Sequence, residues 1–425
     1  MERRNFLTHL GGSLATTALM IANNATANPA LNQSNDQNLA SGPNSIRKAF
    51  SRLEKDIYLN AAGMMPLSTF SEKGLQQYLN FQRLGYNDGD GEYVSAMQNE
   101  IRELFASLIK AKVDEIGLVH CTKAGEQIVL DAIDSIKSKG SIVTNDLHFS
   151  GSLHNLIGLK KSGRDVRIVK AEDWRINLEK MKSAIDERTA LVNVSLVSNI
   201  NGHIEAIGEL AQVAHQHGAI VYADIIQAAG IVPIDVHKMG IDVAACSCYK
   251  WLYGVHGTGF LFVSEKLQGS KLQDRLFPGS IRHNYAPWVE TPELTKEDFI
   301  YQAKTDATRY QPGHISYLGY CAAYEGLKFI KHMGVETLLR HSVKLNRQLK
   351  SMLNKDRFEC ISPNIDASPI ITFRTHENDN IKAKLKKAGI VVSYGKNRLR
   401  VSPAIYNNSE DIEKLALVLN EGAIK

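Results

Sequence analysis

Strand-like and helix-like segments alternate through the middle of this chain, from about Glu115 to Ser264. Short β-branched or apolar runs recur there, with helical periodicity between several of them. Strands are expected at Ile116–Val119, Ser141–Thr144, Val166–Val169, Leu191–Leu196, Ala219–Ala223, Val243–Ala245 and Phe260–Val263. Near-continuous apolar strands joined by helices predict an α/β fold with a mostly parallel seven-stranded sheet that is covered on both faces. Such sheets bind ligands at the carboxyl ends of their strands.

Two of the intervening segments carry an apolar stripe at helical spacing. The first stripe comprises Ile128, Val129, Ala132, Ile133 and Ile136. The second begins at Leu210, Val213 and Ala214 and stops before His217-Gly218, which is typical of a helix end.

Composition places the chain among ordinary globular proteins. Its 425 residues are 44% hydrophobic and 22% charged, which excludes wholesale disorder, collagen and a membrane bundle. The net charge of +5 without a Lys/Arg block gives no support for nucleic-acid binding. Five cysteines without a CxxC or Cys/His zinc spacing indicate neither a disulfide framework nor a zinc site, and no metal is expected.

The N-terminal segment is typical of an export signal rather than of a fold. Arg3-Arg4 precedes a modestly apolar stretch from Leu10 to Ala22, and Ala25-Thr26-Ala27 is a small-x-small cleavage site. This order predicts a twin-arginine (Tat) signal, the Tat translocase as a partner during export, and a periplasmic location. The alternative is a chance Arg-Arg pair before a weak amphipathic helix. Because the Tat route carries folded proteins, the signal favours a tightly held cofactor.

The length of the chain suits two unequal domains after this signal segment. We predict a signal peptide at 1–27, a linker at 28–45, an N-terminal arm at 46–65, a large domain at 66–315 and a small C-terminal domain at 316–425.

Polar residues follow two of the expected strands. Thr122 and Lys123 open a helix, where free N–H groups attract an anion such as phosphate; a simple N-cap is the alternative reading of Thr122. Asp224 ends another strand, with Gln227 three residues on. A carboxylate in this position needs a cation, such as a protonated ring nitrogen, to offset its desolvation, and here too an N-cap is the alternative.

A lysine in an apolar run is the sharpest anomaly of the sequence. Lys250 lies between Tyr249 and Trp251-Leu252 after a strand, where burial would favour its neutral, nucleophilic form; a side chain that reaches solvent is the alternative. Near the C-terminus, Arg398 or Arg400 could clamp a carboxylate with two parallel hydrogen bonds, unless this strand face is simply solvated.

An anion site, a ring stacker after Ser141–Thr144, a buried acid, an amine nucleophile and a carboxylate clamp occur in that chain order. Pyridoxal phosphate (PLP) chemistry requires this inventory. No G-x-G-x-x-G turn or GK[ST] loop supports a nucleotide-binding alternative.

Several motifs resemble class V aminotransferases, which are fold-type I PLP enzymes. They are Tyr58–Gly63 with Pro66-Leu67, Val197–Asn199, Ala223–Ala228, Cys248–Leu252 and Arg400–Pro403. The resemblance covers about Ile57 to Leu419. Tyr-Lys-Trp-Leu and the short C-terminal arginine segment are similar to the isopenicillin N epimerase-like branch, and the Tat signal is similar to that of the exported PLP enzyme of pyoverdine maturation.

The resemblance implies a role for each matching residue. Lys250 matches the Schiff-base lysine, Asp224 the partner of the pyridinium nitrogen, and Arg400 the clamp of the substrate carboxylate. Further implied cofactor contacts are Gln227 and Asn199 at the ring hydroxyl, Thr122, Lys123, Ser247 and Tyr249 at the phosphate, and Phe149 stacked on the ring, with His148 as its competitor. Family members are homodimers, and Gly279-Ser280 is the expected contribution of the partner subunit to the phosphate site.

The sequence also departs from the family. Cys-Thr-Lys-Ala-Gly at 121–125 stands where relatives often have Asn-Thr-Thr-Glu-Ala, so Lys123 adds a charge near the phosphate. Cysteine desulfurases carry a catalytic cysteine shortly before the clamp arginine, and Gly389 to Arg400 contains none.

The expected function is therefore that of an exported PLP enzyme acting at the α-carbon of an amino-acid group. The chemistry is of the aminotransferase or epimerase type, and the substrate is a small molecule, a secreted peptide or a siderophore. A C–S or C–C lyase similar to kynureninase is the first alternative, and a non-catalytic binding protein on the same fold is the second.

Overall fold

The computed structural model describes residues 43–85, 90–136, 139–272, 280–283, 299–302, 304–375 and 378–421. The predicted signal peptide, most of the predicted linker and Gly279 lie outside these ranges, as does the side chain of Ser280. A short helix, α2 (Pro43–Lys48), begins within the last residues of the predicted linker. Among the described helices, none is both long and apolar enough to cross a membrane.

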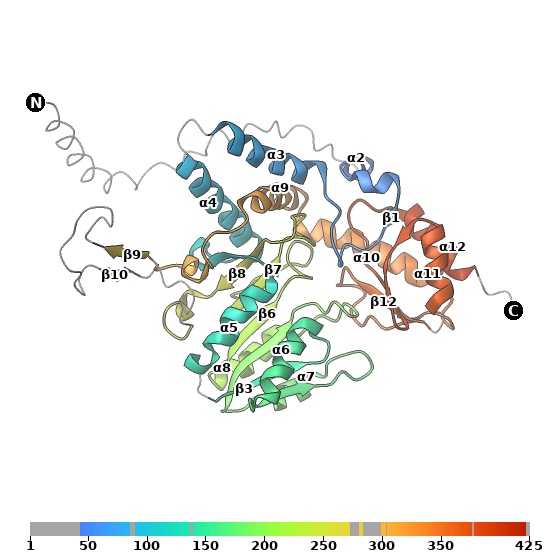
Figure 1. The fold of residues 1–425 in the computed structure, drawn as a ribbon. Coiled ribbons are helices and arrows are strands. Elements are labelled where there is room, and N and C mark those ends of the chain that lie inside the picture. Colours follow the sequence, from blue (N-terminus) through green and yellow to red (C-terminus); the bar gives the residue numbers. More distant parts are fainter. Residues whose placement is uncertain are drawn as a thin grey trace, which may run out of the picture. The chain divides into compact units, whose positions relative to one another are not determined.

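A seven-stranded sheet forms the centre of the described chain (Figure 1). Its strand order is β2-β8-β7-β6-β5-β3-β4. The bounds are β2 (Ile116–Val119), β3 (Ser141–Asn145), β4 (Val166–Val169), β5 (Thr189–Ser195), β6 (Ile220–Asp224), β7 (Val243–Ser247) and β8 (Gly259–Val263). All seven predicted strands are confirmed within two residues. Every residue of β2, β3, β5, β6, β7 and β8 is buried, so both faces of these strands are covered, as their continuous apolar runs indicate.

One strand runs against the others, and it brings two strand ends together. β8 pairs antiparallel with both β2 and β7, whereas the pairs β4-β3, β3-β5, β5-β6 and β6-β7 are parallel. Gly259 of β8 lies opposite Val119 at the end of β2 and opposite Ser247 at the end of β7. The carboxyl ends of β2 and β7 therefore meet at one level, although their chain positions are more than a hundred residues apart.

Helices cover this sheet and share its hydrophobic core. The predicted apolar stripes form α5 (Thr122–Ile136) and α8 (Ile207–Gln216). The other helices of this region are α3 (Thr69–Leu84), α4 (Asp90–Ile109), α6 (Ser150–Lys161) and α7 (Leu178–Ser183). α5 packs on β7 and β8, and residues of its stripe join those of the strands in one core cluster. Short elements are η2 (Ser51–Glu54), η3 (Val113–Glu115), η4 (Glu265–Leu267), η6 (Ala307–Tyr310) and the antiparallel pair β9 (Ser280–His283) and β10 (Phe299–Gln302).

A second hydrophobic core lies in the C-terminal part. An antiparallel sheet in the order β11-β12-β15-β14 packs with the last helices. The elements are α9 (Tyr317–Met333), α10 (Val335–Met352), β11 (Glu359–Cys360), β12 (Ile371–Arg374), α11 (Asn378–Lys387), β13 (Ile390–Val391), β14 (Ser393–Gly395), β15 (Arg398–Val401) and α12 (Ser409–Asn420). β1 (Ile57–Tyr58) of the N-terminal arm pairs with β13, and Leu59 joins this second core. The boundary at residue 316 stays a prediction.

The loop that carries Lys250 is packed tightly against α9. A Cβ atom on Gly326 of α9 would lie 2.2 Å from the carbonyl oxygen of Leu252 and 2.9 Å from the Cβ of Tyr253. Gly158, on the exposed side of α6, has no such neighbour within 4 Å. Substitution of these two helical glycines therefore distinguishes the effect of a close backbone contact from the effect of helix propensity.

We predict that Gly326→Ala lowers the free energy of unfolding by about 2 kcal/mol, because the added methyl group meets backbone that has no room to move. Gly158→Ala is expected to raise that free energy by up to about 1 kcal/mol, since it only restricts the unfolded chain. Urea titration of both variants measures the difference. Equal stabilities of the two variants would contradict the packing described here.

Candidate active site

Four of the predicted site residues meet at the carboxyl edge of the large sheet. Asp224 is the last residue of β6 and lies opposite Ser195 of β5 and Ala245 of β7. Ser247 is the last residue of β7, and Lys250 follows three residues later. The Thr122 N–H at the start of α5 donates to Ser247 Oγ at 2.9 Å, and the two hydroxyl oxygens are 3.0 Å apart. The structure thus brings the predicted phosphate residues Thr122 and Ser247 together.

Lys250 is buried, with 7% of its surface exposed. Its Nζ lies 5.6 Å from the ring centroid of Tyr249, and that ring stacks on exposed His256 at 4.0 Å. Within the described part of the chain, no carboxylate lies within ion-pair distance of Lys250. Burial lowers the pKa of Lys250 to about 8, with Asp224 opposing the shift and Arg400 adding to it. The side chain does not reach solvent. Because burial disfavours the charged form, the neutral, nucleophilic form of this amine is more accessible than that of an exposed lysine.

Asp224 is a buried carboxyl group whose pKa is raised by its desolvation. Three neighbours oppose this shift: His148, the Ile226 N–H that donates to Oδ1 at 2.9 Å, and Lys250. Asp224 and Lys250 each shift the pKa of the other, so the acid and the amine share one site.

Arg400 reaches the same site from β15 of the C-terminal sheet. Its Nη1 donates to the carbonyl oxygen of Asn199 at 2.7 Å, and its Nη2 donates to Asn60 Oδ1 at 3.3 Å. Its Nε is buried without a hydrogen-bond partner. Burial, together with Arg398, lowers the pKa of Arg400 to about 10. No acidic side chain of the described residues forms an ion pair with this guanidinium, which is 95% buried.

The donor set fits a ligand with two anionic groups. Two buried cations without acidic partners are costly unless an anion offsets them. The unpartnered Nε of Arg400 and the buried, unpartnered Oδ1 of Asn199 add polar atoms that a ligand would satisfy. PLP carries a phosphate and an amino-acid substrate carries a carboxylate, so both match this surplus of positive charge.

Gln227 takes part in the protein's own hydrogen bonds. Its Nε2 donates to the carbonyl oxygen of Ala62 at 2.9 Å, and its Oε1 accepts from the Trp251 indole at 3.0 Å. The amide therefore ties the N-terminal arm to the lysine loop. One N–H and one lone pair remain for the predicted contact with the ring hydroxyl.

His148 and Phe149 occupy different surroundings. His148 is fully buried, with Nδ1 2.7 Å from Ser195 Oγ and Nε2 2.9 Å from Asn193 Oδ1. The half-buried Phe149, which precedes α6, has its ring close to Gly151 in the first turn of that helix. The structure thus places His148 in the buried network beside Asp224.

The charge of Lys123 is neutralised locally, contrary to the expected added charge near the phosphate. Its ammonium pairs with Glu126, one turn along α5. The i,i+3 spacing was the available signal, because such positions face each other on a helix. Lys123 therefore adds no net charge to the predicted phosphate site.

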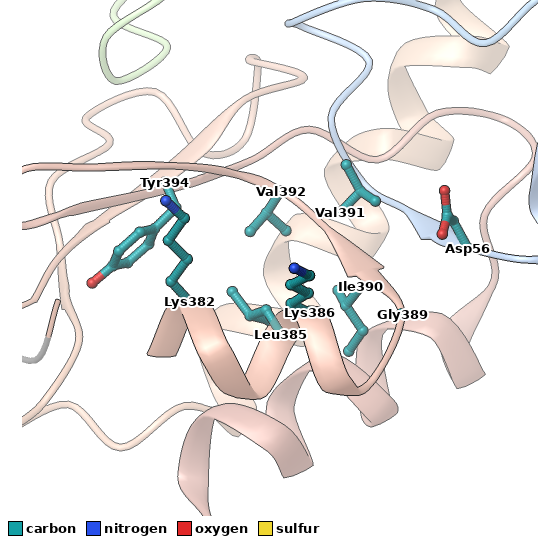
Figure 2. Close-up of a pocket in the computed structure, with 9 residues that line it drawn as sticks. All are labelled: Asp56, Lys382, Leu385, Lys386, Gly389, Ile390, Val391, Val392 and Tyr394. Carbon is teal, nitrogen blue, oxygen red and sulfur yellow. The ribbon is translucent and has the colours of Figure 1, made fainter. Parts of the chain in front are cut away.

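A separate cavity of about 370 Å³ lies between α11 and the segment 389–394 (Figure 2). Apolar side chains of Leu385, Ile390 and Val392 line it, together with Lys382 and Lys386. It includes none of the predicted site residues, so the strand ends remain the candidate active site.

Comparisons with known proteins agree with this geometry. The model of the class-V aminotransferase family matches residues 67–415. A probable cysteine desulfurase from Methanothermobacter thermautotrophicus is 27% identical, over 88% of this chain and 97% of its own length. The uncharacterized aminotransferase YcbU of Bacillus subtilis is 24% identical, over 87% and 95%.

Solved structures share the fold. The cysteine desulfurase CsdA of Escherichia coli superposes with a TM-score of 0.77 at 19% identity, covering 89% of this chain and 98% of that one. The cystine C–S lyase C-DES, in complex with its reaction product cysteine persulfide, also gives 0.77 at 17% identity, covering 88% and 99%. The mostly parallel sheet, the strand-end site and the family match together identify the chain as a member of the class V aminotransferase family of fold-type I, PLP-dependent enzymes.

Proposed function

We propose that this enzyme uses PLP to act at the α-carbon of an amino-acid substrate whose carboxylate binds Arg400. The observation that carries the proposal is the burial of Lys250 and Arg400, both without an acidic partner among the described residues, beside the carboxyl group of Asp224. These groups come from both sheets, and they supply an amine, a carboxylate clamp and a partner for a protonated ring nitrogen.

Each residue has a defined task in this proposal. PLP supplies a ring that accepts electrons from a bond at the α-carbon. Thr122, Ser247, Tyr249 and the start of α5 would hold its phosphate, Asp224 its ring nitrogen, Asn199 and Gln227 its hydroxyl, and His148 or Phe149 its ring face. Lys123 would act there only together with Glu126, because the two charges offset each other.

Lys250 and Arg400 would divide the work on the substrate. Arg400 would orient the carboxylate and thereby select the bond at the α-carbon that is aligned for cleavage. Lys250 Nζ would accept the α-proton and return it, which a pKa of about 8 suits near neutral pH. Asn60 and the Asn199 carbonyl would hold the guanidinium in place, since both accept its hydrogen bonds.

A C–S lyase is the second candidate, and the relatives favour it. Several are named cysteine desulfurases, and C-DES is named a cystine C–S lyase. In this chain β14 and β15 form a tight hairpin in which Gly395 pairs with Arg398, and residues 389–400 contain no cysteine. A desulfurase that stores sulfur on a cysteine of this segment is therefore disfavoured, whereas a lyase that releases its sulfur product is not. The epimerase-like branch remains the sequence-based prediction.

The purified protein should turn yellow with PLP, and Lys250→Ala should not, because the colour requires the lysine-bound cofactor. Arg400→Gln should bind PLP but lose the colour change that amino acids cause, with affinity reduced by about a hundredfold since a charged clamp is lost. Arg398→Gln, on the same strand, is the matched control. Visible absorption spectra of the wild-type protein and of the three variants, with PLP and with added amino acids, measure these differences.

A colourless wild-type protein in saturating PLP would refute the proposed function. A loss of response in Arg398→Gln, with Arg400→Gln unaffected, would show that Arg398 rather than Arg400 binds the substrate carboxylate. Product analysis on responsive amino acids then separates the candidates. A keto acid formed only with an amino acceptor indicates transamination, inversion indicates epimerisation, and pyruvate or alanine release indicates a lyase.

The lowered pKa of Lys250 predicts a pH-dependent stability difference in the cofactor-free protein. Below about pH 8 the amine is protonated in both the folded and the unfolded chain, so the folded chain bears the full cost of burying the charge. Between about 8 and the ordinary value of 10.5, the folded chain releases its proton first and gains stability.

Lys250→Met should therefore be more stable than wild type at pH 7, on the order of 3 kcal/mol, with a gain that shrinks from about pH 8 upward. Urea titrations across this pH range measure it. Lys160→Met, on the exposed surface of α6, should show no such trend. A gain for Lys250→Met that is absent at pH 7 and appears only above pH 8 has the opposite sign and would contradict the burial argument.

We also propose export by the Tat route, on the strength of Arg3-Arg4, the apolar stretch and the Ala-x-Ala site. Changing Arg3 and Arg4 together to Lys should retain the protein in the cytoplasm, because the translocase reads the arginine pair. Cell fractionation of a bacterial host measures this, and changing Lys48 to Arg is a control that should leave export unchanged. Undiminished export of the double variant would count against the proposal. The homodimer stays a prediction.

A further inference from the structure

Glu126 is a buried carboxylate that the proposed chemistry does not use. It lies in α5 with 1% of its surface exposed. Its Oε2 accepts a hydrogen bond from Ser152 Oγ at 2.9 Å and pairs with the Lys123 ammonium, while its Oε1 accepts from Asn193 Nδ2 at 2.9 Å. Because the fold provides this buried carboxylate with several specific partners, its position is well defined.

The surroundings keep Glu126 ionised. Burial alone raises the pKa of this carboxyl group, but His148 and Lys123 outweigh burial and lower it to about 2. His148 Nε2 lies 3.8 Å from Oε1, and Lys123 contacts Oε2. An ionised carboxylate accepts hydrogen bonds and donates none, so the group it meets on Asn193 must be the NH₂.

This assignment determines where a proton sits on His148. With the Asn193 NH₂ turned to Glu126, the amide oxygen faces His148 Nε2 at 2.9 Å. An amide oxygen only accepts, so Nε2 must carry a hydrogen. Nδ1 then faces Ser195 Oγ at 2.7 Å, and Ser195 lies opposite Asp224 in the register of β5 and β6. A chain of contacts thus runs from Glu126 through Asn193 and His148 to the strand pair that ends in Asp224.

We propose that Glu126 is a positioning residue that, through Asn193, holds the proton of the His148 imidazole on Nε2 and so leaves Nδ1 facing Ser195, opposite Asp224. His148 lowers the pKa of the buried Asp224 carboxyl group and so favours its ionised form. The inference rests on the proposed function, because an ionised Asp224 matters where it meets a protonated ring nitrogen. The opposite arrangement has a protonated Glu126, a reversed Asn193 amide and a bare Nε2.

Nitrogen-15 NMR of the imidazole distinguishes the two arrangements in the wild-type holoenzyme and again after PLP removal. The His148 signals are assigned by their loss in His148→Gln. We expect a proton on Nε2 in both forms. A bare Nε2 with the proton on Nδ1 would overturn the inference. Because the cofactor-free form reports the same proton, this result is independent of whether PLP binds, which the visible spectrum reports separately.

In Glu126→Gln the Asn193 amide should no longer be held in one orientation, because the glutamine amide can both donate and accept a hydrogen bond. The His148 signals should then indicate mixed tautomers, and PLP should dissociate about fivefold faster, the effect of one net hydrogen bond. Ser152→Ala is the matched control, because it removes a bond to the other carboxylate oxygen but keeps the charge; it should leave both readouts unchanged. Wild-type signals in Glu126→Gln, or equal shifts in Ser152→Ala, would overturn the inference. If Glu126→Gln does not fold, the wild-type spectrum alone decides.

Discussion

Uncompensated positive charge is the constraint on which this site depends. The Lys250 amine and the Arg400 guanidinium are both buried, and Arg400 lies close enough to lower the pKa of Lys250. Asp224 lies close enough to shift the pKa of Lys250, but its own pKa is raised by burial. Within the described ranges, Arg400 donates hydrogen bonds to a backbone carbonyl oxygen and a side-chain amide oxygen, which stabilise a guanidinium without cancelling its charge. Such a site gains stability when an anionic ligand binds the folded chain.

The hairpin after β5 explains how Arg400 is held against the large sheet. Residues 197–204 fold back, with Val197 bridged to Ile204. The Asn199, Ile200 and Asn201 carbonyl oxygens accept hydrogen bonds from Arg400, Thr372 and Ser362 of the C-terminal part, at 2.7, 3.0 and 2.6 Å. Three successive carbonyl groups thus connect a strand of one sheet to residues of the other. These contacts hold Arg400 and its sheet against the backbone that follows β5, and in the proposed function such a fixed position favours a precise alignment of substrate.

Local pattern was sufficient for the strands but not for the pairing between distant segments. Six of the seven apolar runs are strands buried on both faces, whereas β4, at the edge of the sheet, is only partly buried after Val166. Asp224, Ser247 and Lys250 lie at or just after strand ends, as predicted. The reversal of β8 carries no signal in its own sequence, because an antiparallel strand buried on both faces looks like a parallel one. The pairing of β1 with β13 joins segments more than three hundred residues apart. The hydrogen bond that Gln227 donates to Ala62 and the one that it accepts from Trp251 also depend on the assembled fold. No periodicity reports such contacts.

The departure at 121–125 shows why a single residue cannot be interpreted alone. Lys123 looks like an added positive charge at the phosphate end, yet its ammonium is engaged by Glu126 one turn along the helix. The groups left for an anion are the N–H groups at the start of α5 and the paired hydroxyls of Thr122 and Ser247, which contribute dipoles rather than charge. Glu126 in turn uses its other oxygen to orient Asn193 and, through it, His148. The departure at 121–125 is therefore linked, through the buried Glu126 carboxylate, to the buried His148 beside Asp224.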